Sequence, residues 1–275
     1  MKTIAKTFLL VAALSSAFTS CKKETTDTDN DTNTAQDNSL SESTYDDAND
    51  ISDLAAKGSL LLKLEEGGND LLSTCAMVTY DTVSSFKTTT INFGTTNCMC
   101  LDGKNRRGKI IVTHTGHYKD PGTVITISFD GYYVNDNHVE GSRTVTNNGL
   151  NADNNISFSV VVNGTITKAD GTVITWTSTR TREWITGYET ATKSDDQYRV
   201  TGTASGTRAN GASFTAETVT PLIRKVECHQ FVSGTVKIMV TGKRTRTIDF
   251  GNGDCDDTAT VSIEGITATK TITLH

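Results

Sequence analysis

Oxygen-bearing side chains crowd the end of the stretch TIDFGNGDCDD, residues 247–257. Carboxylate and amide oxygens are the ligands that calcium and other hard cations take in proteins. A loop at this point could place five of them around such an ion: Asp249, Asn252, Asp254, Asp256 and Asp257.

Nearly the same phrase occurs earlier as TINFGTTNC, residues 90–98, with fewer acids. This first copy and the residues after it keep only Asn92, Asn97 and Asp102, whereas Phe, Gly and Cys persist in both copies. The shared residues are therefore predicted to be architectural, with a strand end, a turn glycine and a disulfide cysteine. Calcium at residues 249–257 is the alternative.

A second candidate site is WTSTRTREW, residues 176–184. On one unbroken strand Trp176, Arg180, Arg182 and Trp184 share a face. Arginine between aromatic rings can stack by cation–π contact, and such a strip would suit a sugar or an anionic glycan. In the alternative interpretation, the two tryptophans are core residues and the arginines pair with acids across the sheet.

The sequence contains none of the usual catalytic motifs, since GxSxG, HExxH and a phosphate-binding loop are all missing. Glu140, Glu183, Glu189 and Glu217 could supply paired carboxylates for glycoside hydrolysis, but no spacing selects two of them. His114 and His117 are three residues apart, so on a strand they point to opposite faces unless Gly116 makes a bend. A non-enzymatic role is favoured, without catalytic residues.

These residues must be positioned by strands, because short alternating runs of apolar and polar residues follow one another from about Leu71 to the C-terminus. Gly, Asn and Asp separate the runs and suit tight hairpin turns. The pattern predicts an all-β body, a large antiparallel meander sheet or sandwich built from successive hairpins. Residues 50–66 alone suggest a short N-terminal helix.

The cysteines fall into two similar spacings, with Cys75 before Cys98 and Cys228 before Cys255. Each spacing encloses a predicted hairpin, so we expect two disulfide-stapled modules, around residues 71–120 and 225–275, that flank a central hairpin meander. Cys100 could replace Cys98 as the partner of Cys75, which leaves one of the two as a free thiol.

The first twenty residues have the three-part plan of a secretory signal: two lysines, an apolar run and small residues. Cys21 follows directly after FTS, and this arrangement resembles the lipobox of bacterial lipoproteins. The resemblance implies a signal peptide at residues 1–20 and a Cys21 that carries acyl chains such as palmitate. An ordinary secretory signal, with Cys21 in a disulfide, is the alternative.

Residues 21–50 are acidic and nearly devoid of apolar side chains. Such a segment cannot bury enough surface to offset the entropy of ordering, so it is predicted to be a disordered tether before a β-rich body at 51–275. An acidic stretch after a lipid-bearing cysteine resembles the surface-export signal of Bacteroidota-type lipoproteins. The basic pair after Cys21 departs from that signal, so both the cell surface and the periplasmic face of the outer membrane stay open.

The formal net charge of −6 gives no electrostatic case for binding nucleic acid. The Thr-rich hairpins and the recurring VxGT phrase resemble the β-rich lipoproteins of Bacteroidota-type bacteria, from which no catalytic residue carries over. We expect a lipid-anchored envelope protein with a binding or structural role, and a glycan or a surface protein as its partner. A carrier of lipid or glycolipid and a glycan-processing hydrolase are the two alternatives.

Overall fold

The computed structural model describes residues 29–56, 76–81, 83, 87–190, 192–208 and 211–274. They form one long helix, α1 (Asn33–Ala56), a short 3-10 turn η1 (Val226–Cys228) and a single antiparallel sheet of fourteen strands. The strands are β1 (Met77–Asp81), β2 (Lys87–Asn92), β3 (Cys98–Met99), β4 (Asn105–His114), β5 (Val124–Val134), β6 (Asn137–Leu150), β7 (Ile156–Thr167), β8 (Val173–Thr186), β9 (Gln197–Arg208), β10 (Ser213–Lys225), β11 (Gln230–Val240), β12 (Arg246–Asn252), β13 (Thr258–Ile263) and β14 (Lys270–Thr273).

The strands follow one another in chain order across the sheet, apart from β3, which pairs with β4 off the main path. Tight turns connect neighbouring strands and so place them side by side in chain order. The turn between β5 and β6 is an example. Its residues Asn135 and Asp136 have φ of 47° and 62°, the left-handed conformation that two-residue hairpin turns require. The predicted all-β meander of hairpins, with one N-terminal helix, is confirmed.

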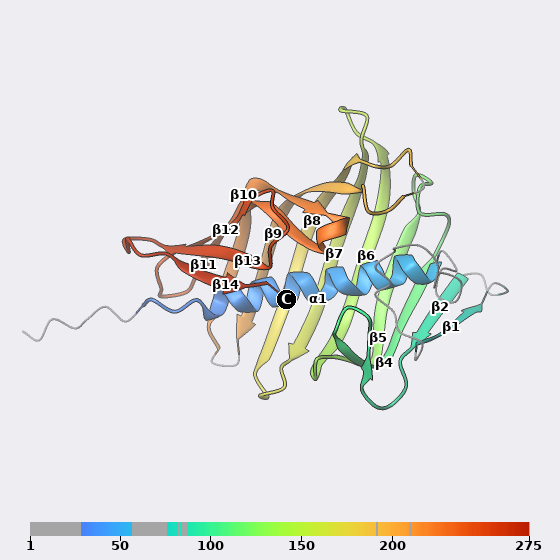
Figure 1. The fold of residues 1–275 in the computed structure, drawn as a ribbon, viewed down its shortest axis with the longest axis horizontal. Helices are drawn as coiled ribbons and strands as arrows, with labels where there is room; N and C mark the ends of the chain where they lie inside the picture. The colour runs from blue at the N-terminus through green and yellow to red at the C-terminus, as the bar shows by residue number, and fades with distance from the viewer. Residues whose placement is uncertain are drawn as a thin grey trace, which may run out of the picture.

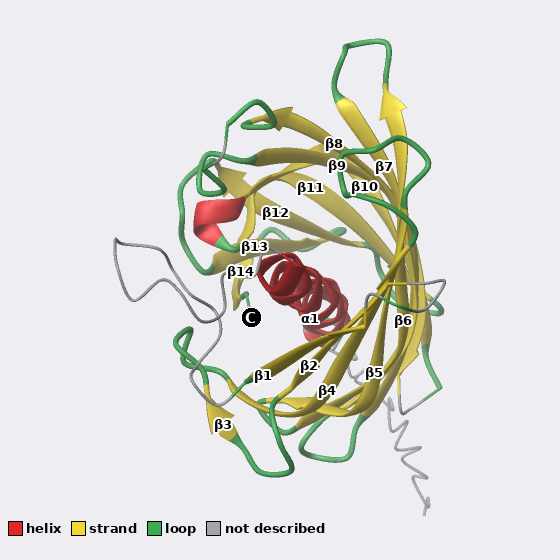
Figure 2. Ribbon diagram, turned by 90° about the vertical axis from the view of Figure 1, so that its right-hand side faces the viewer, coloured by secondary structure: helices red, strands yellow, loops and turns green. Residues whose placement is uncertain are grey.

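The sheet is strongly curved, and α1 lies along its inner face (Figure 1). Seen from the side, the strands arch around the helix from β1 to β14 (Figure 2). Burial along β8 alternates strictly from Val173 to Arg182, which shows that one face of the strand meets the helix while the other meets solvent. The core of the protein therefore lies between the helix and the concave side of one sheet.

The prediction of a disordered tether at 21–50 is wrong for residues 33–50, which belong to α1; residues 21–28 lie outside the described part. The helix expected at 50–66 shares only its first residues with α1, and 57–66 are not described. The composition of this segment predicts disorder because it does not include the partners that the segment finds elsewhere in the chain. In the fold the helix gains partners on nearly every side and buries five apolar side chains completely: Ala35, Tyr45, Ala48, Ile51 and Ala55.

Tyr45 docks the middle of α1 onto the sheet. Its hydroxyl donates a hydrogen bond to the Glu140 carbonyl at 2.8 Å, and its ring stacks on Trp176 with 5.8 Å between ring centroids. The ring end lies against Gly164 of β7, where a Cβ atom would come within 1.7 Å of the tyrosine oxygen. The absence of a side chain at position 164 therefore leaves the space that the Tyr45 ring occupies.

We expect Gly164→Ala to destabilise the protein by about 1–3 kcal/mol, because the added methyl group must displace Tyr45 from its packed position. Urea unfolding measures the change. In a Tyr45→Ala background the same alanine should cost much less, since the clash is gone. Equal costs in the two backgrounds would show that Tyr45 does not occupy this space.

The predicted Cys228–Cys255 disulfide is confirmed, and it ties η1 to the loop between β12 and β13. Cys98 is also disulfide-bonded, while Cys100 is the buried free thiol, which settles the alternative left by the sequence. Cys75, the predicted partner of Cys98, lies outside the described residues. The strands of the two expected modules are continuous with the same sheet and lie toward its two ends.

Candidate functional site

The strip on β8 has the shared face that its alternation predicts, but that face is buried beneath α1. Trp176, Arg180, Arg182 and Trp184 are between 1% and 6% exposed. The Trp176 indole donates a hydrogen bond to the Asn38 side chain at 3.2 Å, so this strip forms part of the seat of the helix. While α1 is in place, the strip offers no open surface to a glycan.

Arg180 pairs with an acid, as the alternative interpretation expected, although this acid, Glu42, lies on the helix instead of on a neighbouring strand. Arg182 forms no ion pair with a described residue and donates a hydrogen bond to the Tyr118 hydroxyl instead. Helix α1 carries six carboxylates and no basic residue, and every one of the six forms an ion pair with a basic residue of the strands or of the loops between them. The pairs are Asp37 with Lys168 and Arg208, Glu42 with Arg180, Asp46 with Arg143 and Arg224, Asp47 with Lys104 and Arg106, Asp50 with Arg224, and Asp53 with Lys193.

These pairs continue N-terminal to the helix, where Asp29 and Asp31 meet Lys243 and Arg246. The Asp31 carboxylate also accepts a hydrogen bond from the backbone N–H of Asn33 at 3.3 Å, at the helix start. An acidic helix thus packs against the basic residues of the sheet and its loops. Ion pairs form along the described N-terminal segment from Asp29 to Asp53.

Two carboxylates at the centre of the helix, the buried Asp47 and the half-buried Asp46, are held in their charged form. Burial acts to raise the pKa of Asp47, but the charges of Arg106 and Lys104 outweigh it, so the pKa lies below its usual value of 3.8. Burial likewise acts to raise the pKa of Asp46, and nearby arginines, Arg143 first among them, lower it below 3.8.

Three acids of the loop predicted as a calcium site accept hydrogen bonds, two of them from nearby backbone N–H groups. Asp249 accepts from the N–H of Gly251 at 2.9 Å, and Asp256 accepts from the N–H of Thr258 at 2.9 Å. Asp257 accepts from the side chain of Gln230 at 3.0 Å. Asn252 and Asp254 are exposed in the same stretch. Such bonds stabilise turns, which agrees with the architectural interpretation of the repeated phrase.

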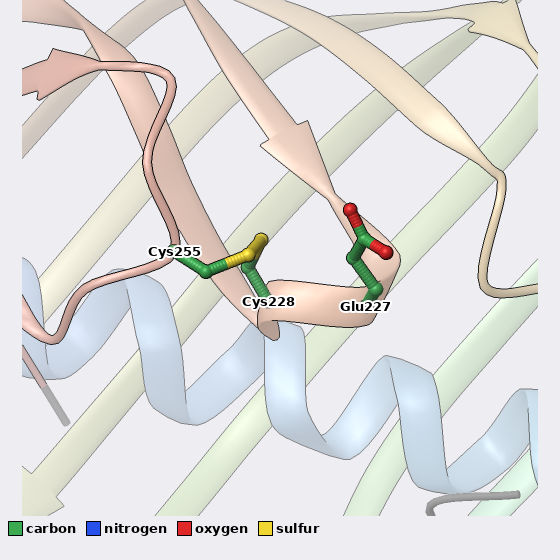
Figure 3. Close-up of side chains that lie close together, drawn as sticks. All are labelled: Glu227, Cys228 and Cys255. Carbon is green, nitrogen blue, oxygen red and sulfur yellow. A yellow bond between two sulfur atoms is a disulfide. The ribbon is translucent and has the colours of Figure 1, made fainter.

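Across the described part of the chain, one group of three His, Cys, Asp or Glu residues brings its ligand atoms within 4.8 Å of one another. It consists of Glu227, Cys228 and Cys255 (Figure 3). The two sulfur atoms are bonded to each other, so neither can act as a thiolate ligand. The four aspartates among the residues predicted for calcium do not form such a group.

A cavity of about 600 Å³ lies beside the C-terminal half of α1. Six strands contribute to it, namely β1, β2, β4, β5, β8 and β9, together with the turns after β4 and β8. The lining comprises Asn49, Ser52, Asp53, Tyr80, Asp81, Lys87, Thr88, Thr89, Val112, His114, Gly116, His117, Tyr118, Lys119, Ile125, Ile127, Trp184, Lys193, Asp196 and Tyr198.

The cavity lining divides into a buried apolar part and an exposed polar part. Ile127 is fully buried, and Val112, Trp184 and Tyr198 are each 5% exposed. By contrast, the lining residues Lys87, His117 and Lys119 are exposed. The cavity can therefore hold an apolar group against its inner wall while polar groups remain near its mouth.

Both histidines of the THTGHY stretch line this cavity. His114 is the last residue of β4, and its Nδ1 lies 3.1 Å from the carbonyl oxygen of Gly116. His117 follows in the turn. The bend at Gly116 is what allows two histidines three residues apart to reach one space, although they do not form a cation-binding group with another residue.

Sequence reasoning missed the cavity, because its lining comes from residues 49–198 and no single stretch carries a recognisable pattern. The burial of basic residues beneath α1 can be seen at one point in the sequence. Arg180 and Arg182 alternate with threonines on a strand whose same face carries two tryptophans. This pattern indicates arginines on a core face, where a buried charge normally has an opposite charge beside it.

No family model matches the chain, and neither the curated proteins nor the solved structures contain a significant match to it. Among the described residues, no helix has both the length and the apolar character needed to cross a membrane.

Proposed function

We propose that the protein is a non-enzymatic binding protein of the cell envelope whose cavity takes the apolar part of an amphipathic molecule, such as a lipid or a glycolipid. Acyl chains on Cys21 would hold it at the outer membrane. The observation that carries the proposal is the cavity of about 600 Å³ between α1 and the sheet. Small-molecule sites usually enclose about 300–1,000 Å³.

The inner wall supports an apolar ligand. Val112, Ile125 and Ile127 supply aliphatic surface from two neighbouring strands, β4 and β5. Trp184 and Tyr198 add aromatic surface from β8 and β9. Removing apolar ligand surface from water against such a wall contributes about 25 cal/mol per Å² before the costs of binding.

The mouth supports a polar or charged head group. Lys87 and Lys119 are exposed at the lining, and the Lys119 ammonium lies 5.0 Å from the Trp184 ring centroid. Asp53 pairs with Lys193 at 3.4 Å, and Asp81 and Asp196 also line the cavity, so its three lysines are balanced by three aspartates. We therefore expect the mouth to accept a polar head group.

The protein from residue 22 onward should bind the fluorescent fatty acid cis-parinaric acid at one saturable site. Val112→Trp should weaken this binding at least tenfold, about 1.4 kcal/mol, because the indole fills the cavity at its inner wall. Fluorescence titration measures both affinities, and an unlabelled fatty acid should compete.

The matched control is Val161→Trp, a substitution of the same kind at a valine of β7 that is 47% exposed. It should bind like the unmodified protein. Equal, unsaturable binding in all three proteins, with folding verified by circular dichroism, would overturn the proposal.

A further inference from the structure

A second, much smaller cavity lies deep between α1 and strands β6, β7, β8, β9 and β10, with a volume of about 10 Å³. This is about the space that one water molecule or one monatomic ion occupies. Four arginines, two carboxylates and two valines line it: Glu42, Asp46, Arg143, Val160, Arg180, Arg182, Val200 and Arg224.

Positive charge exceeds negative charge around this cavity. Arg180 pairs with Glu42, Arg143 with Asp46, and Arg224 with Asp50. Arg182 is the fourth cation, and no ion pair joins it to a carboxylate of the described residues. Among the described residues, one guanidinium charge therefore lies in the interior without a counter-charge in direct contact, although Asp53 and Asp46 act on it from further away. The four arginines are only 3–6% exposed.

The neighbours of Arg182 are aromatic. Its Nη2 donates to the Tyr118 hydroxyl at 2.6 Å, and its guanidinium carbon lies 4.8 Å from the Tyr198 ring centroid and 5.1 Å from that of Phe158. Cation–π contacts of this kind stabilise a buried cation in part, but they do not neutralise it. A buried charge normally has an opposite charge beside it.

Two hydrogen-bond donors are also left over at this cavity. Among the described residues, the Nε–H groups of Arg143 and Arg182 are buried and have no acceptor. Burial lowers the pKa of Arg143, and the charge of Arg182 lowers it further against the opposing effect of Asp46. Two arginines with unused donors thus line a space of atomic size that carries excess positive charge.

We propose that this cavity is a binding site for a monatomic halide, chloride in the cell envelope, which accepts hydrogen bonds from the guanidinium groups of Arg143 and Arg182. A halide matches the cavity in size and supplies the missing negative charge. Sulfate and phosphate are excluded by volume. The bound ion would join β6 to β8 beneath the helix and stabilise the folded state by mass action.

Thermal unfolding tests the site. The full chain is unfolded in urea, refolded in sodium chloride or in sodium gluconate of equal ionic strength, and melted. Chloride should raise the Tm along a saturating curve, by about 3 °C at ten times its Kd. Arg182→Met should abolish the difference between the two salts. The control Arg199→Met, at a half-buried arginine that pairs with Glu183 and Asp153 away from this cavity, should keep it.

Crystals of the unmodified protein grown in sodium bromide provide a second measurement that does not depend on a variant that folds. An anomalous peak between Arg143 and Arg182 is expected. A peak of water height without anomalous signal, or bromide at the protein surface only, would overturn the proposal. So would equal Tm values in chloride and gluconate at every concentration.

Discussion

Glu42→Gln should destabilise the protein by about 3–5 kcal/mol, the usual cost of removing one partner of a buried ion pair. The Glu42 carboxylate accepts a hydrogen bond from the Arg180 Nε at 3.2 Å, and the two residues are only 8% and 3% exposed. The neutral amide cannot balance the guanidinium, so Arg180 would remain charged in the interior. Urea unfolding at neutral pH measures the loss.

Two controls separate burial from charge alone. Asp130→Asn breaks the Lys109–Asp130 pair, whose side chains are 42% and 59% exposed, and should cost less than about 1 kcal/mol. The double variant Glu42→Gln, Arg180→Met should be more stable than Glu42→Gln alone, because the unpaired charge is gone. A cost for Glu42→Gln no larger than for Asp130→Asn would show that α1 does not bury this pair.

Acid should unfold the protein because the carboxylates of α1 must then take up protons. The pKa values of Asp46 and Asp47 are lowered in the fold below 3.8, the value expected for the unfolded chain. A lowered pKa contributes stability that is present above pH 3.8 and is lost as the pH falls through the folded-state value. We expect a loss of several kcal/mol between about pH 5 and pH 2, measured by urea unfolding across this range.

The charged groups that face these two acids are arginines and one lysine, which stay protonated throughout that range. They are Arg106 and Lys104 beside Asp47, and Arg143, Arg182 and Arg224 beside Asp46. Asp47→Asn should reduce the slope of stability against pH, since one proton fewer is taken up on unfolding. A stability that is flat from neutral pH to pH 2 would contradict the ion-paired helix.

The sheet could be predicted from the sequence because its information is local. The alternation in β8 and the turn residues between strands are visible within a dozen residues, and they gave the all-β meander. The Cys228–Cys255 pair followed from spacing. Helix α1 could not be predicted in this way, because its stabilising partners are distant. Asp29, just before the helix, meets Arg246, 217 residues further along the chain.

The candidate sites illustrate the same limit. Sequence alone placed Trp176 and Trp184 on one face, but it could not show that α1 covers that face. The lining of the large cavity combines Asn49 of the helix, Val112 of β4 and Tyr198 of β9, which only the curvature of the sheet brings together. Arginines on the core face of a strand need acidic partners, so an acidic segment without basic residues elsewhere in the chain is a candidate to supply them.

Hydrogen–deuterium exchange of the segment 33–56 tests most directly whether this acidic stretch is a folded element inside the sheet. Its backbone amides should be protected to nearly the same extent as those of β7 and β8, because ion pairs and buried side chains join the helix to these central strands. Exchange of these amides as fast as in an unstructured peptide, while β7 and β8 remain protected, would contradict a helix packed inside the sheet. The segment would then be a disordered tether, as its composition predicts.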